Sequence, residues 1–304
     1  MTIRRRWTLI AAALFAFGLG ICWIFGSLSM RPASSVVSPA VTPARDLTIA
    51  SSDGVILAAT YWPGSRADSP AVLLLHGNGA SRGQFAQEGA MLARQGYAVL
   101  AIDFRGHGES TPRNRTFGWT EADDAHAAFT WLKRQQHGAK VAVVGISLGG
   151  AAALIGPRGP LPADALVLQA VYPDIRRAIG NRIAALSFRP LAWLVEPLLS
   201  YQAPLRFGAW PADISPVRSV ARYHGPLRVV GGEDDVYTPP AETLALYEAA
   251  PGPKRLWIAP GLDHAGISAA GTPAYRALLI GFLEATLGKT APGGSPLSAR
   301  STPA

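Results

Sequence analysis

The sequence is poor in cysteine, in histidine and in charge. One cysteine among 304 residues cannot form an internal disulfide, and six scattered histidines do not complete a structural zinc site. A hydrophobic core must therefore stabilise the fold. With 49% hydrophobic residues, and at about 100–200 residues per domain, the chain suits one large domain or two small ones and is not wholly disordered.

Acidic residues are absent from the first 45 residues, which contain five arginines. These arginines supply five of the eight excess positive charges, and the rest of the chain has 23 basic and 20 acidic residues. Because that remainder is nearly balanced, we expect no nucleic-acid partner.

Residues 7–30 contain no charged residue, amide or histidine. A helix of this length spans about 36 Å, enough for a hydrocarbon core of about 30 Å, so we expect residues 1–30 to form a transmembrane anchor. Ser27-Leu28-Ser29 leaves a cleaved export signal as the alternative. Three arginines precede the run and one directly follows it, which predicts a cytoplasmic N-terminus and a domain on the periplasmic or extracellular side.

Two segments of low apolar content border the predicted domain. Residues 31–45 contain three prolines and are expected to be an extended linker that lifts the domain off the membrane. Residues 289–304 are rich in glycine, proline and serine, and we expect a disordered tail there. The folded domain is then residues 46–288.

Short apolar runs alternate with helical patterns through residues 46–288. Two β-prone runs, 46–50 and 55–62, flank a polar turn and predict an antiparallel hairpin. Continuously apolar runs, typical of parallel strands buried on both faces, follow at 71–75, 97–102, 141–144, 165–169, 227–230 and 256–258. Helices are expected at 83–95, 121–136, 148–155, 240–249 and 273–287. This alternation predicts a doubly wound α/β domain with a mostly parallel sheet.

One interval, residues 173–223, interrupts the alternation and is too long for a structureless loop. We expect a helical lid over the carboxyl ends of the strands, where open α/β sheets bind their ligands. Its apolar residues are expected to form an acyl pocket: Phe188, Trp193, Leu194, Leu198 and Leu199.

Ser147 is the candidate nucleophile. It lies in Gly145-Ile146-Ser147-Leu148-Gly149, directly after a predicted strand and before a predicted helix. This is the context of a G-x-S-x-G elbow, in which small flanking residues allow a sharp turn that exposes the serine hydroxyl.

A serine hydroxyl needs a base and a group that orients the base. In the order serine, acid, histidine, the acid should follow the strand at 227–230, where Glu233, Asp234 and Asp235 stand together. Asp235 is preferred because it lies at the tip of the turn, with Asp234 as the alternative. His264 follows the last predicted strand and is the only histidine after residue 224.

The oxyanion of a tetrahedral intermediate needs two fixed N–H donors. We expect them to be the backbone amides of Leu148, directly after the nucleophile, and of Asn78, in the glycine-rich loop after the strand at 71–75. His76, in the same loop, is interpreted as holding the loop, and residues 103–110 as an ion-paired loop that braces the rim of the site.

The chain resembles the α/β-hydrolase superfamily, in particular the branch of serine aminopeptidases and monoacylglycerol lipases. The motifs that carry the resemblance are HGNGA at 76–80, DFRGHGES at 103–110, GISLGG at 145–150, GGEDDVYTPP at 231–240 and GLDHAG at 261–266. It implies Ser147 as nucleophile, Asp235 as orienting acid and His264 as base, with Asn78 and Leu148 as oxyanion donors.

The sequence thus predicts a membrane-anchored serine hydrolase that forms an acyl-enzyme, with a small-molecule or lipid-like ester as the preferred substrate. No Walker loop, dinucleotide-binding fingerprint or cluster of metal ligands is present, so no cofactor and no metal are expected. An aminopeptidase is the alternative, for which Asp174, Glu196 or Asp213 of the lid would bind the substrate amine. A catalytically inactive, membrane-anchored binding module is the other alternative.

Overall fold

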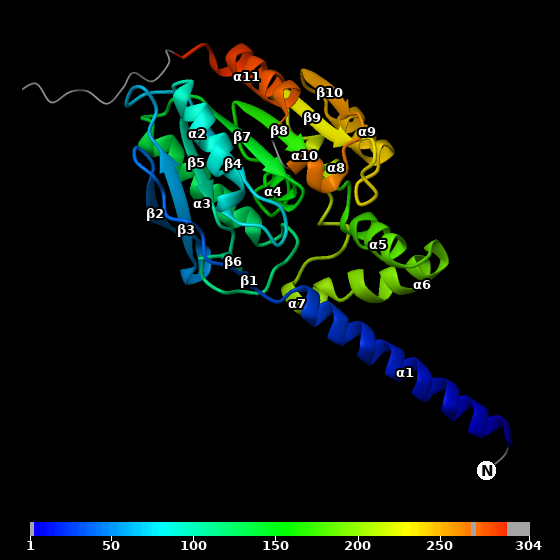
Figure 1. Ribbon diagram of the computed structural model, residues 1–304. Coiled ribbons are helices and arrows are strands. Elements are labelled where there is room, and N and C mark those ends of the chain that lie inside the picture. Colours follow the sequence, from blue (N-terminus) through cyan, green and yellow to red (C-terminus); the bar gives the residue numbers. More distant parts are fainter. Residues whose placement is uncertain (1–2, 269–271, 291–304) are drawn as a thin grey trace, which may run out of the picture.

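The computed structural model describes residues 3–268 and 272–290. One large sheet forms its centre (Figure 1), with the strands β2 (Arg45–Ala50), β3 (Ile56–Trp62), β4 (Ala71–Leu75), β5 (Ala98–Ile102), β7 (Val141–Ile146), β8 (Ala165–Gln169), β9 (Leu227–Gly232) and β10 (Lys254–Ala259). Their order in the sheet is β10-β9-β8-β7-β4-β5-β3-β2. Every pairing is parallel except those of β3, which is antiparallel to both its neighbours. The predicted hairpin and mostly parallel sheet are confirmed.

Helices cover both faces of the sheet: α2 (Ala86–Arg94), α3 (Glu121–Gln135), α4 (Leu148–Ala152), α9 (Pro240–Ala249), α10 (His264–Ser268) and α11 (Pro273–Leu287). Short 3₁₀ turns span Ser52–Gly54 and Arg82–Phe85. Alternate residues of β4 belong to different layers. Leu73 and Leu75 pack with α3, α4 and α9, whereas Val72 and Leu74 pack with α2 and α11. This double burial explains why the strands have no polar face.

The interval that interrupts the alternation forms a helical insertion between β8 and β9. It contains α5 (Ile175–Leu186), α6 (Arg189–Ser200), α7 (Ala203–Phe207) and α8 (Pro216–Val220). Asp174 caps α5 by accepting a hydrogen bond from the Arg177 amide at 2.9 Å. The helices α5 and α6 pack against each other beside the sheet (Figure 1).

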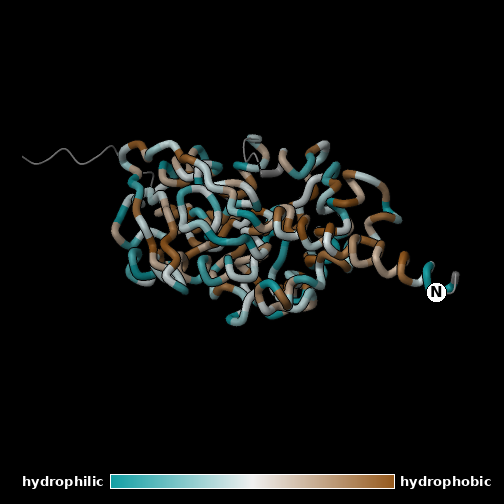
Figure 2. Tube along the Cα trace, turned by 90° about the horizontal axis from the view of Figure 1, so that it is seen from below, coloured by the Kyte–Doolittle hydropathy of each residue, from teal (hydrophilic) through white to brown (hydrophobic). Residues whose placement is uncertain are grey.

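The N-terminal helix α1 (Ile3–Ser29) projects away from the sheet and leaves the domain beside α7 (Figure 1). It is long and apolar enough to cross a membrane, and almost none of its apolar surface is buried in the protein. Hydrophobic colouring follows its length in Figure 2 up to a hydrophilic N-terminal end.

The segment after α1 contacts the domain along its course. Its short strand β1 (Ala33–Ser34) pairs in parallel with β6 (His107–Gly108), and the amide of Val37 donates to Glu109 at 3.3 Å. The predicted linker is therefore extended, but it holds α1 against the domain. Most of the predicted tail, residues 291–304, lies outside the described residues.

Candidate active site

Ser147 lies in a sharp turn between β7 and α4. Its backbone has φ 49° and ψ −110°, a strained combination for a residue with a side chain. A Cβ at Gly145 would lie 2.6 Å from the Cα of Gly150, and one at Gly149 would lie 2.1 Å from the carbonyl oxygen of Leu75. The turn can form only because both positions are glycine, which is the requirement of a nucleophile elbow.

Asp235 and His264 are joined by a hydrogen bond. The Nδ1 of His264 donates to Oδ2 of Asp235 at 2.7 Å. The other carboxylate oxygen of Asp235 accepts from the amides of Tyr237 at 2.9 Å and Thr238 at 2.8 Å. Since Asp235 is buried and held on both oxygens, it fixes the orientation of the imidazole and leaves its Nε2 available.

The two neighbouring acids lie elsewhere. Asp234 and Glu233 are exposed, and the carboxylate of Glu233 accepts from the amide of Gly261 at 3.0 Å. The choice of Asp235 over Asp234, which the sequence left open, therefore agrees with the geometry. The tip of the turn is the position that faces the histidine.

The loop after β4 is fixed by His76. Its Nδ1 donates to the carbonyl of Gly77 at 2.7 Å, and its Nε2 accepts from the amide of Phe104 at 3.1 Å. Burial lowers the pKa of His76 to about 3, with a further contribution from His107, so the ring is neutral. Both ring nitrogens serve the backbone, which supports the interpretation of His76 as a holder of the loop.

Ser147, Leu148 and Asn78 line one cavity of about 350 Å³. The oxygen of the Asn78 side chain accepts from Arg115 at 2.9 Å, so this side chain is held at the cavity wall. All five predicted site residues follow the carboxyl ends of β4, β7, β9 or β10. The structure thus brings them together in two groups, three around the cavity and two in the Asp235–His264 pair.

The sequence and the fold are similar to those of known proteins. A family model described as serine aminopeptidase, S33, matches residues 67–207. An uncharacterized protein of Mycobacterium tuberculosis is 32% identical over 243 residues, which cover 79% of this chain and 78% of the relative. The lysophosphatidylserine lipase ABHD12 of Danio rerio is 27% identical over 206 residues, covering 64% of this chain and 51% of that protein.

Among solved structures, the esterase Pf2001 of Pyrococcus furiosus is similar in fold. It has a TM-score of 0.61 at 23% identity, and the match covers 84% of this chain and 100% of that one. The chain is an α/β hydrolase.

The polar loop of this hydrolase beside the site is braced by buried ion pairs. Arg82 donates from its side chain to Asp103 and, at 2.6 Å, to Glu109. Arg105, in the same loop, donates to the carboxylate of Asp124 from Nε at 2.9 Å and from Nη2 at 2.8 Å. Residues 103–110 therefore form the ion-paired loop that the sequence suggested.

The walls of the cavity differ from the expected ones. Of the five apolar residues expected there, Leu199 lines the cavity. Leu198 does not line it, and Phe188, Trp193 and Leu194 are largely exposed. Residues of α5 and α7, such as Ile179, Ile183 and Phe207, take their place. An amphipathic helix with apolar surroundings on two sides can turn either side toward the cavity. The sequence alone therefore could not show which side of α6 lines it.

The cavity also contains arginines that the sequence did not single out. Arg115, Arg182 and Arg206 line it, together with no acidic residue of the described chain. None of the three forms an ion pair with a described aspartate or glutamate. No local motif marks them, because each reaches the cavity from a different segment.

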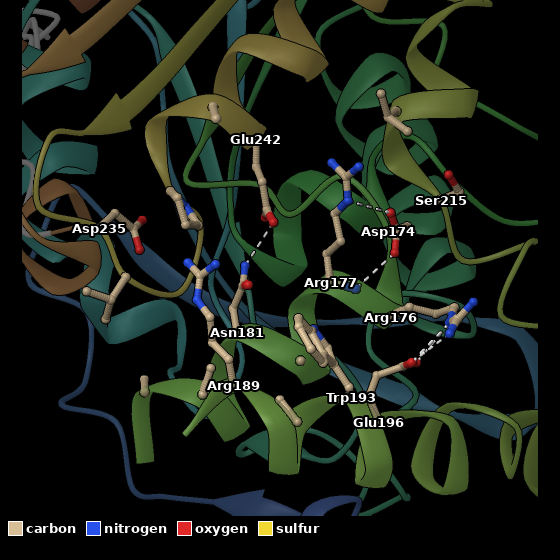
Figure 3. A pocket seen from close by; sticks show the side chains of 18 of the residues that line it. Asp174, Arg176, Arg177, Asn181, Arg189, Trp193, Glu196, Ser215, Asp235 and Glu242 are labelled. Carbon is tan, nitrogen blue, oxygen red and sulfur yellow. Dashed lines mark hydrogen bonds and ion pairs between the residues drawn. The ribbon is translucent and has the colours of Figure 1, made fainter. Parts of the chain in front are cut away.

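A second, larger cleft of about 1500 Å³ lies between the insertion and the loop after β9 that contains Asp235 (Figure 3). In it Arg176 binds Glu196 through two hydrogen bonds from Nε and one from Nη2, between 2.8 and 3.1 Å. Asp174 pairs with Arg177 at 3.6 Å, and Asn181 donates to Glu242 at 2.9 Å. Two ion pairs of the insertion thus line this cleft, whereas Arg189, Arg218 and Glu242 have no ion pair among the described residues.

Proposed function

We propose that this hydrolase is a serine esterase that acts on lipid-like carboxylic esters and works through an acyl-enzyme. The observation that carries the proposal is the hydrogen bond between Asp235 and His264 at the same sheet edge that presents Ser147 at a strained elbow. A nucleophile, a base and an orienting acid in this chain order on this fold are the parts that acyl transfer requires.

In the proposed reaction, the hydroxyl of Ser147 attacks the ester carbonyl while Nε2 of His264 accepts its proton. Asp235 holds the proton of Nδ1 and stabilises the imidazolium. The amides of Asn78 and Leu148 donate to the oxyanion. His264 then returns the proton to the leaving alcohol, and a water molecule activated by the same imidazole hydrolyses the acyl-enzyme.

The cavity favours an ester with one acyl chain over a peptide with a free amine. Its volume of about 350 Å³ lies near the lower end of the roughly 300–1,000 Å³ typical of ligand pockets, and its surface is mainly apolar. The three acids considered for amine binding are engaged elsewhere: Asp174 with Arg177, Glu196 with Arg176, and Asp213 with the amide of Trp210 at 2.9 Å. The similarity to a lysophosphatidylserine lipase supports the same substrate class.

We further propose that α1 stays attached as a membrane anchor, with the catalytic domain on the outer side. The charge-free run after three arginines supports this topology. A protease added to spheroplasts of a Gram-negative expression host should digest the domain. Full protection until the inner membrane is permeabilised would place the domain in the cytosol.

Labelling with a fluorophosphonate tests the nucleophile. The wild-type protein should label and Ser147→Ala should not, with Ser35→Ala, an exposed serine outside the cavity, as the control. Equal labelling of wild type and Ser147→Ala, or no labelling of wild type, would remove the serine-hydrolase mechanism; the second result would favour an inactive binding module.

The substrate class is tested with matched ester and amide panels. We expect hydrolysis of p-nitrophenyl esters and little hydrolysis of aminoacyl p-nitroanilides. Faster cleavage of the aminoacyl amides, dependent on their free amine, would make the protein an aminopeptidase.

A further inference from the structure

The cavity at Ser147 has one wall that the domain does not provide. Phe25, Gly26, Ser29 and Met30, in the last turns of α1 and directly after it, line the cavity together with α5 and α7. α1 also contacts α6 near this end. Without these residues the apolar cavity would be open on one side.

Two arginines join the end of α1 to the domain. The guanidinium of Arg206 lies 3.9 Å from the centroid of the Trp23 ring and donates to the Trp23 carbonyl at 2.6 Å and to the hydroxyl of Ser27 at 3.1 Å. Arg115 donates to the carbonyls of Ser29 at 2.9 Å and Arg31 at 2.7 Å. The carbonyl of Ser29 is one of the last four of α1, which lack a partner within the helix, so Arg115 stabilises the C-terminal end of α1.

Gly26 lies close to Gln202, directly before α7, and to Arg206 of α7. A Cβ at this position would lie 2.5 Å from Oε1 of Gln202 and 3.1 Å from Nη2 of Arg206. Gly20, nearly two turns earlier in the same helix, has no atom within 4 Å of its own Cβ position. The sequence of α1 is therefore adapted to the cavity at its end, while its earlier part is almost wholly exposed.

The cavity also lies at the membrane surface if α1 spans the bilayer. A hydrocarbon core of about 30 Å takes up about 20 helical residues, so a span that begins at Trp7, after the arginines, ends near Gly26. Large apolar side chains of the insertion are exposed on the same part of the molecule, among them Leu186 and Leu205, each 81% exposed. Such side chains suit contact with the apolar boundary of a bilayer.

We propose that the end of α1 is a specificity-determining wall of the acyl pocket. Long acyl chains enter this pocket from the adjoining bilayer and pack against that wall. The proposal rests on the proposed esterase function and adds to it a chain-length preference set by the anchor. Short esters, which fill only the space beside Ser147, should not depend on this wall.

The test compares Gly26→Leu with Gly20→Leu in the full-length protein, reconstituted in vesicles. Both variants add the same apolar side chain to the same helix, but only the first enters the cavity. Gly26→Leu should lower kcat/KM for p-nitrophenyl laurate by about tenfold or more, because small changes in an apolar pocket change discrimination by about 10–200-fold. It should leave kcat/KM for p-nitrophenyl acetate within about twofold of wild type, and Gly20→Leu should leave both values unchanged.

Equal kcat/KM of Gly26→Leu and wild type on both esters would overturn the proposal while leaving the esterase function intact. An equal loss on both esters with fluorophosphonate labelling retained would also overturn it, since the wall would then affect the reaction and not the chain. Failure of wild type itself to cleave either ester would instead refute the proposed function.

A second measurement guards against misfolding of the glycine variant. Cys22 is the chain's one cysteine, so Phe25→Cys in a Cys22→Ser background gives a single thiol at the cavity wall. A dodecyl fluorophosphonate on Ser147 should slow modification of this thiol by a methanethiosulfonate reagent, and a methyl analogue should not. The control is Val36→Cys in the same background, at a residue that is 93% exposed outside the cavity. Its thiol should react equally fast in the unmodified protein and with either adduct. Equal reactivity of the Phe25→Cys thiol with both adducts would overturn the proposal.

Discussion

The strand edge around Ser147 and the surface formed by α1 with the helical insertion differ in how their side chains are partnered. At the strand edge, the buried charges Asp103 and Asp124 have arginine partners, and Asp235 is satisfied on both oxygens. On the other surface, large apolar residues are exposed, and three arginines of the cavity have no carboxylate partner among the described residues. The polar groups of the first region are thus bonded within the protein, whereas the second region has the apolar surface and unpaired cations that the proposed substrate and membrane would contact.

The difference separates two tasks. Geometry at the reacting atoms must hold to a fraction of an ångström, so it is built from buried, fully bonded groups. Recognition of a chain that moves between bilayer and protein uses apolar contacts, which have little directional requirement. Substitutions in the first region should therefore lower the stability of the fold or the rate on every substrate. Substitutions in the second region should lower the rate on some substrates only.

The largest effect is expected at Asp235. Asp235→Asn should lower kcat by about 10⁴-fold, because the amide cannot hold His264 in the required tautomer. Asp234→Asn, one residue away and exposed, should stay within about threefold of wild type. Steady-state hydrolysis of p-nitrophenyl acetate measures both. A large loss in Asp234→Asn alone would reassign the orienting acid.

A stability loss is expected from breaking the brace of the rim. Arg82 and Asp103 are 3% and 0% exposed, so Arg82→Met leaves a buried carboxylate without its cation and should lower the free energy of unfolding by about 3–5 kcal/mol. Arg66→Met breaks the exposed ion pair with Asp68 and should lower the free energy of unfolding by about 0–1 kcal/mol. Urea denaturation in detergent compares the two, and similar losses would contradict the contrast.

A pH dependence of stability is expected from Glu88, which is buried in α2. Burial raises its pKa to about 8 from an ordinary value of 4.5. Between these values the unfolded chain binds fewer protons than the folded one, so the free energy of unfolding falls as pH rises from about 4.5 to 8 and then levels off. Glu88→Gln should remove this fall, worth a few kcal/mol, while the exposed Glu248→Gln should keep it. Thermal unfolding at pH 5, 7 and 9 measures it; parallel curves for Glu88→Gln and wild type would exclude Glu88 as the cause.

The smallest effect is expected on the apolar surface of the insertion. Leu205→Ser should slow hydrolysis of a vesicle-embedded laurate ester by roughly two- to fivefold, because about 1 kcal/mol of apolar contact with the bilayer is lost. Hydrolysis of a soluble acetate ester should not change. Val36→Ser, at a residue that is 93% exposed on the segment after α1, serves as the control. Equal slowing by both variants would show that the insertion has no special contact with the bilayer.

The sheet could be predicted from sequence because its strands are marked locally. The runs 71–75 and 165–169 are apolar almost without interruption and coincide with β4 and β8 to the residue. Predicted strands at 141–144 and 227–230 were too short, since the glycines that follow continue the ladder. Because the strands could be located, the order serine, acid, histidine was enough to predict Ser147, Asp235 and His264 as residues that follow strand ends.

Contacts between distant segments could not be predicted. Pairing of Ala33–Ser34 with His107–Gly108 involves two residues on each side and carries no apolar pattern. The contact of Arg206 with Trp23 joins residues 183 positions apart and depends on side-chain direction in two helices. Thr120 directly precedes α3, a position where threonine often caps a helix, but its hydroxyl hydrogen-bonds to Thr116, and Glu121 accepts from the amides of Thr116 and Gly118.

The joined end of α1 has a practical consequence for anyone producing this protein. Membrane anchors are commonly deleted or exchanged to obtain a soluble domain, on the assumption that any apolar helix serves as well. Here the part before about residue 21 fits that assumption, because its side chains are almost all exposed, but residues 23–30 do not. A shortened chain that begins after residue 30 would expose apolar residues such as Phe207 to water. If α1 spans a bilayer as proposed, the part of the helix that can be exchanged ends about one turn before the proposed span does.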